Sequence, residues 1–218
     1  MRVRHALIPL ARVAPLSMSA CNIVGAASVL VSGPPKVPAV ASLEAERTTV
    51  LLVDDLNSVL PRASLRDRIG RAAEGDMLAR KVVDEGKLVS SASARRVVSG
   101  DTNEARTSIV DAGRAVRAEV VVHVAVLGWT MTGTPGEISP EAVIAVKVLD
   151  AMSNERIWPE GEGSFVRQVV LPVRADRQIA SGAERRQVED ALADRIGVTI
   201  AKFFYESERE RISEQREL

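Results

Sequence analysis

The sequence has few of the residue types that most often carry recognisable chemistry. Its 218 residues include one cysteine, two histidines, two tryptophans, one tyrosine and three phenylalanines. A single cysteine, Cys21, excludes an internal disulfide framework and any zinc site built from several thiolates. So few aromatic side chains also exclude stacking platforms for nucleic-acid bases or sugars.

An excess of charge of one sign is missing too, because 29 lysines and arginines balance 29 acidic residues. A protein without net charge lacks the general electrostatic attraction that holds nucleic acid, so we expect no nucleic-acid partner. What the chain does contain is 46% hydrophobic and 27% charged residues. This composition is typical of a small globular protein and excludes a disordered chain or one with many membrane spans.

The amino terminus is basic and then apolar. Residues 1–20 contain arginines but no acidic residue, and they end in small side chains, as a secretory signal peptide does. Residues 18–21 (MSAC) resemble a bacterial lipobox, in which the cysteine thiol receives diacylglycerol before cleavage. We therefore predict a covalent lipid, with palmitate among its acyl chains, on Cys21 and no other cofactor. The alternative is that Cys21 is a buried free cysteine in an ordinary hydrophobic segment.

A transmembrane anchor formed by residues 6–32 is a competing prediction, since about 20 apolar residues span a bilayer. Pro9, Arg12 and Pro15 argue against one continuous helix there. We assign residues 21–46 to a lipidated tether, residues 47–206 to the folded module and residues 207–218 to a charged tail. Either anchor predicts a location outside the cytoplasm, on the periplasmic face of a bacterial membrane, with inner and outer membrane both open.

The hydrophobic patterns predict an α/β (α+β) fold with a mixed sheet of about five strands packed against about three helices. The expected order is β-α-β-α-β-β-β-α, and the short link after Asp150 requires an antiparallel hairpin. Ser64 and Asp67 resemble a capping box that starts the first helix. The expected strands are residues 48–53, 86–90, 119–127, 141–150, 156–158 and 164–171, and the expected helices are residues 64–83, a helix through 109–116, and 183–205.

Two passages carry a family resemblance over roughly residues 47–205. Residues 112–122 (AGRAVRAEVVV) resemble a helix-to-strand passage, and residues 146–158 resemble a hairpin, of the periplasmic α/β modules in the curli-export lipoprotein CsgG. Related modules occur in the amino-terminal domain of TolB and in the LpoB type of lipoprotein that activates a peptidoglycan synthase. The resemblance implies an envelope protein that binds partners and has no catalytic residues. The link at residues 130–140 lacks the alternating pattern of a membrane-spanning hairpin, so we expect no channel.

Asp54 and Asp55 follow an apolar strand, as do the metal-binding carboxylates of phosphoacceptor receiver domains. Asp101 and Lys147 occur further along the chain, where such a domain would need a phosphoacceptor and a lysine. No strong strand leads to Asp101, however, so a receiver-like or hydrolytic enzyme is the less favoured alternative, and we predict no metal site. The simpler interpretation is that the two carboxylates cap a loop at the end of the strand.

His123 interrupts an otherwise apolar strand, and Lys147 interrupts another. A buried imidazole with a hydrogen-bond partner is the simpler interpretation of His123, while a general base is the alternative. Whether His123 and Lys147 lie side by side on neighbouring strands is left open.

Half of the aromatic side chains occur together at Phe203, Phe204 and Tyr205. They are candidates for a partner contact, together with Trp129 and Trp158, because exposed aromatics are enriched at interfaces. The alternative is a wide core stripe with Tyr205 at its wet edge.

These observations together predict a lipid-anchored envelope protein whose module acts in envelope assembly or export by binding other proteins, without catalysis. An oligomeric subunit of an export complex, built from several copies of the chain, is the second hypothesis.

Overall fold

The computed structural model describes residues 35–99, 107–132, 138–173 and 181–208. By its internal contacts the chain divides into two units, Met1–Pro35 and Lys36–Leu218, so every described residue from Lys36 onward belongs to the second unit. The predictions made for Cys21 and Asp101 lie outside the described residues. Within these ranges, no helix combines the length and the apolar character needed to cross a membrane.

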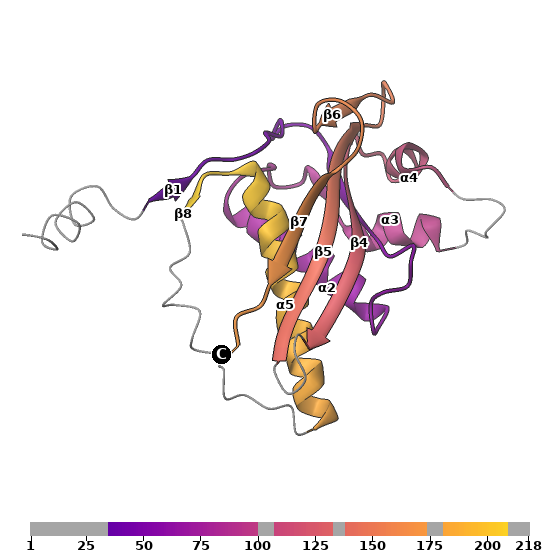
Figure 1. Ribbon diagram of the computed structural model, residues 1–218. Helices are drawn as coiled ribbons and strands as arrows, with labels where there is room; N and C mark the ends of the chain where they lie inside the picture. Colours follow the sequence, from indigo (N-terminus) through magenta and orange to yellow (C-terminus); the bar gives the residue numbers. More distant parts are fainter. Residues whose placement is uncertain (1–34, 100–106, 133–137, 174–180, 209–218) are drawn as a thin grey trace, which may run out of the picture. The chain divides into compact units, whose positions relative to one another are not determined.

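A mixed sheet of six strands forms the centre of the second unit (Figure 1). The strand order is β3-β2-β4-β5-β6, and β7 pairs with β5 alongside β6. The pairs β2–β3 and β2–β4 are parallel, and every pair that involves β5 is antiparallel. The predicted mixed α+β fold is therefore confirmed. The strands are β2 (Thr49–Asp54), β3 (Leu88–Val89), β4 (Val120–Thr132), β5 (Ile138–Asp150), β6 (Arg156–Trp158) and β7 (Phe165–Val170).

The two central strands are apolar on both faces because both faces of the sheet carry a core. Since side chains alternate along a strand, Leu51 and Val122 point to a first face, while Leu52 and Val121 point to a second face. Helices α2 (Ser64–Ala79) and α5 (Gly182–Ala201) cover the first face with the larger of the two cores.

Helices α2 and α5 approach each other closely at Gly197. A Cβ atom added there would lie 2.5 Å from Ala72 Cβ, 2.6 Å from Ile69 O and 2.7 Å from Ala73 N. Two of these neighbours are main-chain atoms, which cannot move aside cheaply. The contact between the helices therefore requires glycine at this position.

Arginines of the α2 region and acids of α5 form an ion-pair ladder along the same contact. Arg62 Nε lies 2.9 Å from Glu189 Oε2, and Arg68 Nη2 lies 2.6 Å from Asp194 Oδ2. Glu189 is only 4% exposed, and Arg62 is the cation that pairs with this buried side chain.

Two short helices, α3 (Ser91–Val98) and α4 (Ile109–Ala115), cover the second face over β2 and the first part of β4. Helix α3 was not among the predicted helices, because its eight residues are too few to repeat an apolar stripe over several turns. Ser108 caps α4 and accepts a hydrogen bond from Asp111 N.

Two predictions about helix ends are wrong. The capping box at Ser64 does not form, because α2 begins after Ala63 and has no side-chain cap, while Asp67 pairs instead with Arg95. A complete capping box does form at the start of α5, between Ser181 and Glu184. The last helix ends at Ala201 rather than 205, and a 3₁₀ turn, η1 (Lys202–Phe204), follows it.

Residues 36–46, assigned from sequence to a tether, lie against the module. Strand β1 (Lys36–Val37) pairs antiparallel with β8 (Ser207–Glu208), which belongs to the segment assigned to a charged tail. The main-chain N–H groups of Val40 and Ala41 both donate to Phe203 O, at 2.9 and 3.0 Å. Ordered structure thus extends beyond both expected boundaries of the module.

Asp150 organises the turn between β5 and β6. Its Oδ1 accepts from Met152 N at 2.7 Å and from Ser153 N at 2.9 Å. Its Oδ2 lies 2.7 Å from Arg47 Nη2, which joins this turn to the segment that leads into β2. These contacts explain why an aspartate ends the long strand and why the chain can reverse there.

Candidate functional site

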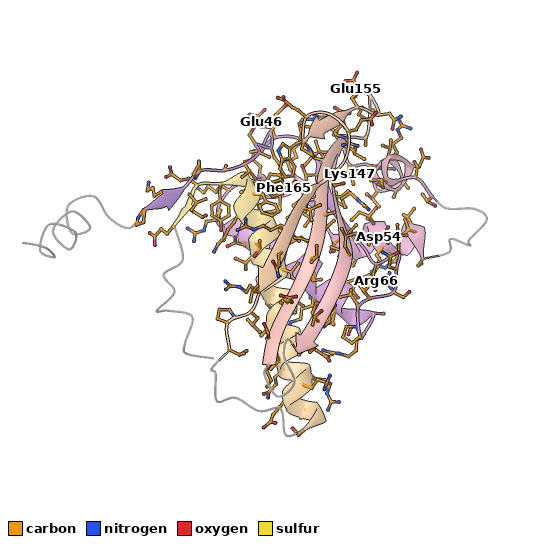
Figure 2. All side chains as sticks on the ribbon, in the orientation of Figure 1. Glu46, Asp54, Arg66, Lys147, Glu155 and Phe165 are labelled. Carbon is orange, nitrogen blue, oxygen red and sulfur yellow. The ribbon has the colours of Figure 1, made fainter. Side chains whose placement is uncertain are left out.

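Three polar side chains interrupt the second face of the sheet on three neighbouring strands. His123 of β4 and Lys147 of β5 are direct cross-strand partners, which answers the question left open by the sequence. Asp54 of β2 is registered with Ala125, two residues beyond His123, and its side chain points to the same face. Figure 2 labels Lys147 near the upper end of the long strands, with Asp54 below it and Arg66 below Asp54.

His123 is the most enclosed member of this polar row, with 6% of its surface exposed. Its Nε2 lies 3.7 Å from Asp54 Oδ2, within ion-pair range but too far for a hydrogen bond. Nε2 has no hydrogen-bond partner among the described residues, and neither has the buried Nε of Arg66 on α2. The expectation of a buried imidazole is met, but its expected hydrogen bond is not formed by Nε2.

The electrostatic consequence is clearest at Asp54. Its carboxyl pKa lies below the ordinary value, mainly because the His123 imidazole N–H faces it and, to a smaller extent, because Arg66 is positive. Partial burial of the carboxyl acts in the opposite direction. The ionised carboxylate is thus the favoured form, held between a histidine and an arginine.

Asp55 does not join Asp54 in a shared acidic pocket. Its Oδ1 accepts from Val59 N at 2.8 Å and its Oδ2 from Leu60 N at 3.2 Å, so both oxygens are used by the loop that follows β2. This matches the simpler interpretation of a carboxylate that caps a loop. Within the described ranges, no three His, Cys, Asp or Glu side chains come together as metal ligands would.

The polar row places a histidine beside a carboxylate. Such a histidine can act as a general base only if a nucleophile or a bound substrate lies within hydrogen-bond reach of its other nitrogen. The direct strand neighbours of His123 are Leu52 and Lys147. Among the described residues, the row therefore forms a partly buried polar cluster on the second face of the sheet.

The aromatic candidates for a partner contact mostly belong to the core. Phe203 and Phe204 are 6% and 7% exposed, as expected for the alternative of a wide core stripe. Phe203 packs against Trp158 and Phe165, with ring centroids 6.3 and 5.2 Å away. Trp158 and Phe165 are both partly exposed, so of the predicted aromatic contacts in this trio Trp158 is the one that a partner could reach.

Tyr205 and Trp129 are the remaining aromatic candidates, and both are partly buried. The Tyr205 hydroxyl donates to Asp76 Oδ2 at 2.6 Å, and Arg80 lies 5.4 Å from the centre of its ring. Burial and the Asp76 carboxylate raise the pKa of Tyr205 to about 12. Trp129 packs against the first core with a buried Nε1 that has no partner among the described residues.

The surface feature that the sequence did not reveal is the half of the second face formed by β5 and β7. By alternation from the core pairs, Val143 and Ala145 of β5 and Val166 and Val170 of β7 point to this face. Val166 is 58% exposed and Val170 43%, whereas Val50 and Leu52 of β2 and Val121 of β4, on the same face but nearer α3 and α4, are buried. We call these four residues the open patch.

A sequence signal for the open patch did exist. In the strand at residues 164–171, Arg167 and Gln168 interrupt both faces, which suits an edge position, and two of its valines share a face with Gln168. What the sequence could not show is that the helices of the second face stop short of β5, since this depends on the lengths of α3 and α4.

The chain matches no family model and no curated protein. Among solved structures, the PelC dodecamer from Paraburkholderia phytofirmans is 11% identical, with 78% of this chain and 96% of that chain covered and a TM-score of 0.45. Lipoprotein GNA1162 from Neisseria meningitidis is 12% identical, with coverage of 66% and 95% and a TM-score of 0.40.

The C-terminal domain of LpoB from Salmonella enterica is also similar, at 17% identity, with coverage of 59% and 87% and a TM-score of 0.32. The solved structures that this chain resembles thus include lipoproteins, at low identity. Likeness at this distance does not decide what the chain does. The resemblance to CsgG and to the TolB domain stays a prediction from the two sequence passages.

Proposed function

We propose that the chain is a lipid-anchored protein of the bacterial cell envelope whose α/β module acts by binding other proteins. The observation that carries the binding role is the open patch, where the exposed Val166 and Val170 and the partly exposed Val143 surround the buried Ala145 and no described helix covers them. Gln168 lies between the two valines on the same face and donates to Glu141 Oε2 at 2.7 Å, so the patch is apolar with a polar centre. Apolar side chains gathered on one exposed face are characteristic of interaction surfaces.

The proposed location rests on the amino-terminal residues. A basic start, an apolar stretch and the MSAC motif ending at Cys21 together fit the processing site of a bacterial lipoprotein. In the proposed mature form, the lipid holds the module at the periplasmic face of a membrane.

Mass spectrometry of the mature amino terminus tests this location. We expect a chain that begins at Cys21 and carries diacylglycerol, and we expect Cys21→Ser to abolish both the acylation and the cleavage. An unprocessed chain that starts at Met1 with an unmodified Cys21 thiol would overturn the proposed anchor.

Site-specific photo-crosslinking in cells tests the binding role. A photoreactive residue in place of Val143 should yield a discrete adduct with an envelope protein, and Ala145→Lys in the same chain should abolish it by placing a charge in the apolar contact. A photoreactive residue at Glu85, an exposed position near β3 at the other end of the sheet, serves as the control. Equal adducts from both positions would contradict a specific surface at the open patch.

A second candidate function, an oligomeric subunit of an export or assembly complex, is favoured by one particular feature. The outer edge of β7 has no partner strand among the described residues, so a copy of the chain can add there.

A further inference from the structure

The two edges of the six-stranded sheet differ in length. At one end, β3 contributes only two residues, which is a common way of protecting an edge from unwanted pairing. At the other end, β7 contributes six residues, pairs with β5 on one side and has no strand on the other among the described residues (Figure 1). It contains a single charged residue, Arg167, and no proline.

The hydrogen-bond pattern shows which main-chain groups face outward from β7. Leu171 N donates to Pro140 O at 2.9 Å, and Val170 is the register partner of Glu141. Because antiparallel pairing alternates residue by residue, the odd-numbered residues of β7 direct their N–H and C=O groups toward β5. The even-numbered residues, Val166, Gln168 and Val170, direct theirs to the free edge.

The side chains of the same three residues lie on the open side of the sheet. Val166 and Val170 are exposed and stand two positions to either side of Gln168, which is also exposed. A sequence of valine, glutamine and valine at this spacing is symmetric about its centre. It is therefore complementary to a second copy of itself that runs in the opposite direction.

We propose that β7 pairs antiparallel with β7 of a second copy of this chain, with Gln168 on the two-fold axis. In this register Val166 of one protomer faces Val170 of the other on both sides of the axis, and the outward main-chain groups exchange about six hydrogen bonds. The two open patches then lie on the same face of one continuous sheet, on either side of the paired Gln168 side chains.

The charge of Arg167 favours this register over the one centred a single residue earlier. Antiparallel strands must pair outward-facing residues with outward-facing residues, so the permitted registers are centred on Arg167, Gln168 or Val169, or lie further out. Centring on Arg167 would place two arginines directly opposite each other, which is unfavourable. Centring on Val169 shortens the overlap, whereas centring on Gln168 faces Arg167 with Val169 and keeps both valine pairs.

Cysteine pairing tests the register in the purified full-length chain carrying Cys21→Ser. Val166→Cys and Val170→Cys proteins are prepared separately and mixed before mild oxidation. Directly opposite residues that exchange hydrogen bonds have Cα atoms about 5.5 Å apart, which a disulfide can join. In a dimer formed by only one of the two variants, the two cysteines are offset along the paired strands by four residues, or about 13 Å.

We expect the mixture to form at least about tenfold more disulfide dimer than either protein alone, given this difference in spacing. A Glu85→Cys protein, with its thiol near the opposite edge of the sheet, reports random collision. Dimer formation in the mixture no greater than in the Glu85→Cys control would overturn the proposal.

A second measurement does not depend on oxidation. In sedimentation experiments on the same chain without added cysteines, Val166→Lys should weaken self-association at least about tenfold, because each lysine replaces an apolar cross-strand contact. Circular dichroism should stay unchanged, since Val166 is exposed. A chain that stays monomeric at all concentrations would refute the pairing and leave the proposed lipid anchor and its test unaffected.

Discussion

Asp150→Asn should reduce the stability of the module in a manner that depends on pH. In the folded protein, Asp150 accepts two main-chain hydrogen bonds from its turn and forms an ion pair with Arg47 at 2.7 Å. These contacts, led by the hydrogen bond from Ser153, lower the pKa of the Asp150 carboxyl from 3.8 to about 2. The asparagine side chain can still accept a hydrogen bond, but it cannot form the ion pair with Arg47.

The lowered pKa sets the size and the sign of the effect. The difference between 3.8 and about 2 corresponds to roughly 2.4 kcal/mol of folding free energy at neutral pH. Because the Asp150 side chain is 19% exposed, screening by water reduces this value, and we expect a loss of about 1–2 kcal/mol. A depressed pKa in the folded state contributes stability above the unfolded value of 3.8, and that contribution is lost as the pH falls through about 2.

Urea unfolding of the original protein and of Asp150→Asn between about pH 7 and pH 2 measures this effect. The two stabilities should differ by about 1–2 kcal/mol at pH 7 and converge toward pH 2, the region in which Asp150 becomes protonated. Glu160→Gln, which removes an exposed carboxylate from the loop after β6, is the control and should change little at any pH. A difference between the two proteins that is constant over the whole pH range would refute the electrostatic reasoning.

Three further predictions concern the helix contact and the anchor. Gly197→Ala should destabilise the module by about 2–3 kcal/mol, because the added methyl group clashes with α2. Gly75→Ala is the control: the added methyl group meets open space there and should stabilise α2 by up to about 1 kcal/mol. Thermal unfolding of both variants measures the two changes in stability. Arg62→Met should lower the free energy of unfolding by about 3 kcal/mol, because it leaves the buried Glu189 without its partner. Arg68→Met removes a more exposed ion pair and should lower it by less than about 1 kcal/mol. Urea unfolding measures both values. Cys21→Ser should leave the chain without lipid and uncleaved, so that immunoblotting shows a band of precursor size in place of the mature one.

The strands of this fold could be predicted because their sequences carry strong local signals. Residues 49–54 and 120–126 are nearly all apolar, which is typical of strands buried on both faces, and both strands lie at the centre of the sheet. The hairpin after Asp150 could be inferred from the short link alone. Neither inference required knowledge of what packs on the sheet.

Features that depend on contacts distant in sequence could not be predicted. Helix α3 is short, and its apolar residues become meaningful only when it lies over β2. The start of α2 resembled a capping box, but Asp67 is taken by Arg95 of α3, an interaction that the local sequence does not reveal. Similarly, Phe203 and Phe204 could face a partner or the core until the position of η1 relative to Trp158 and Phe165 was known.

The candidate site was predicted only in part. His123 and Lys147 were singled out because each interrupts an apolar strand, and the register places them side by side. The open patch was not predicted, because no local sequence signal encodes it. It is the part of the second face that the two short helices α3 and α4 do not reach.

The attachment of residues 36–46 to the end of the chain bears on how far the module can travel from its anchoring point. This segment is held by the two-residue pair β1–β8, by main-chain bonds from Val40 and Ala41 to Phe203 and from Asp84 to Ala45, and by Ala41 and Leu43, which pack against the first core. An extended chain spans about 3.3–3.6 Å per residue, and release of residues 36–46 therefore adds roughly 35 Å of reach. If the proposed lipid on Cys21 holds the chain to a membrane, detachment of this segment under tension lengthens the link before the sheet is strained.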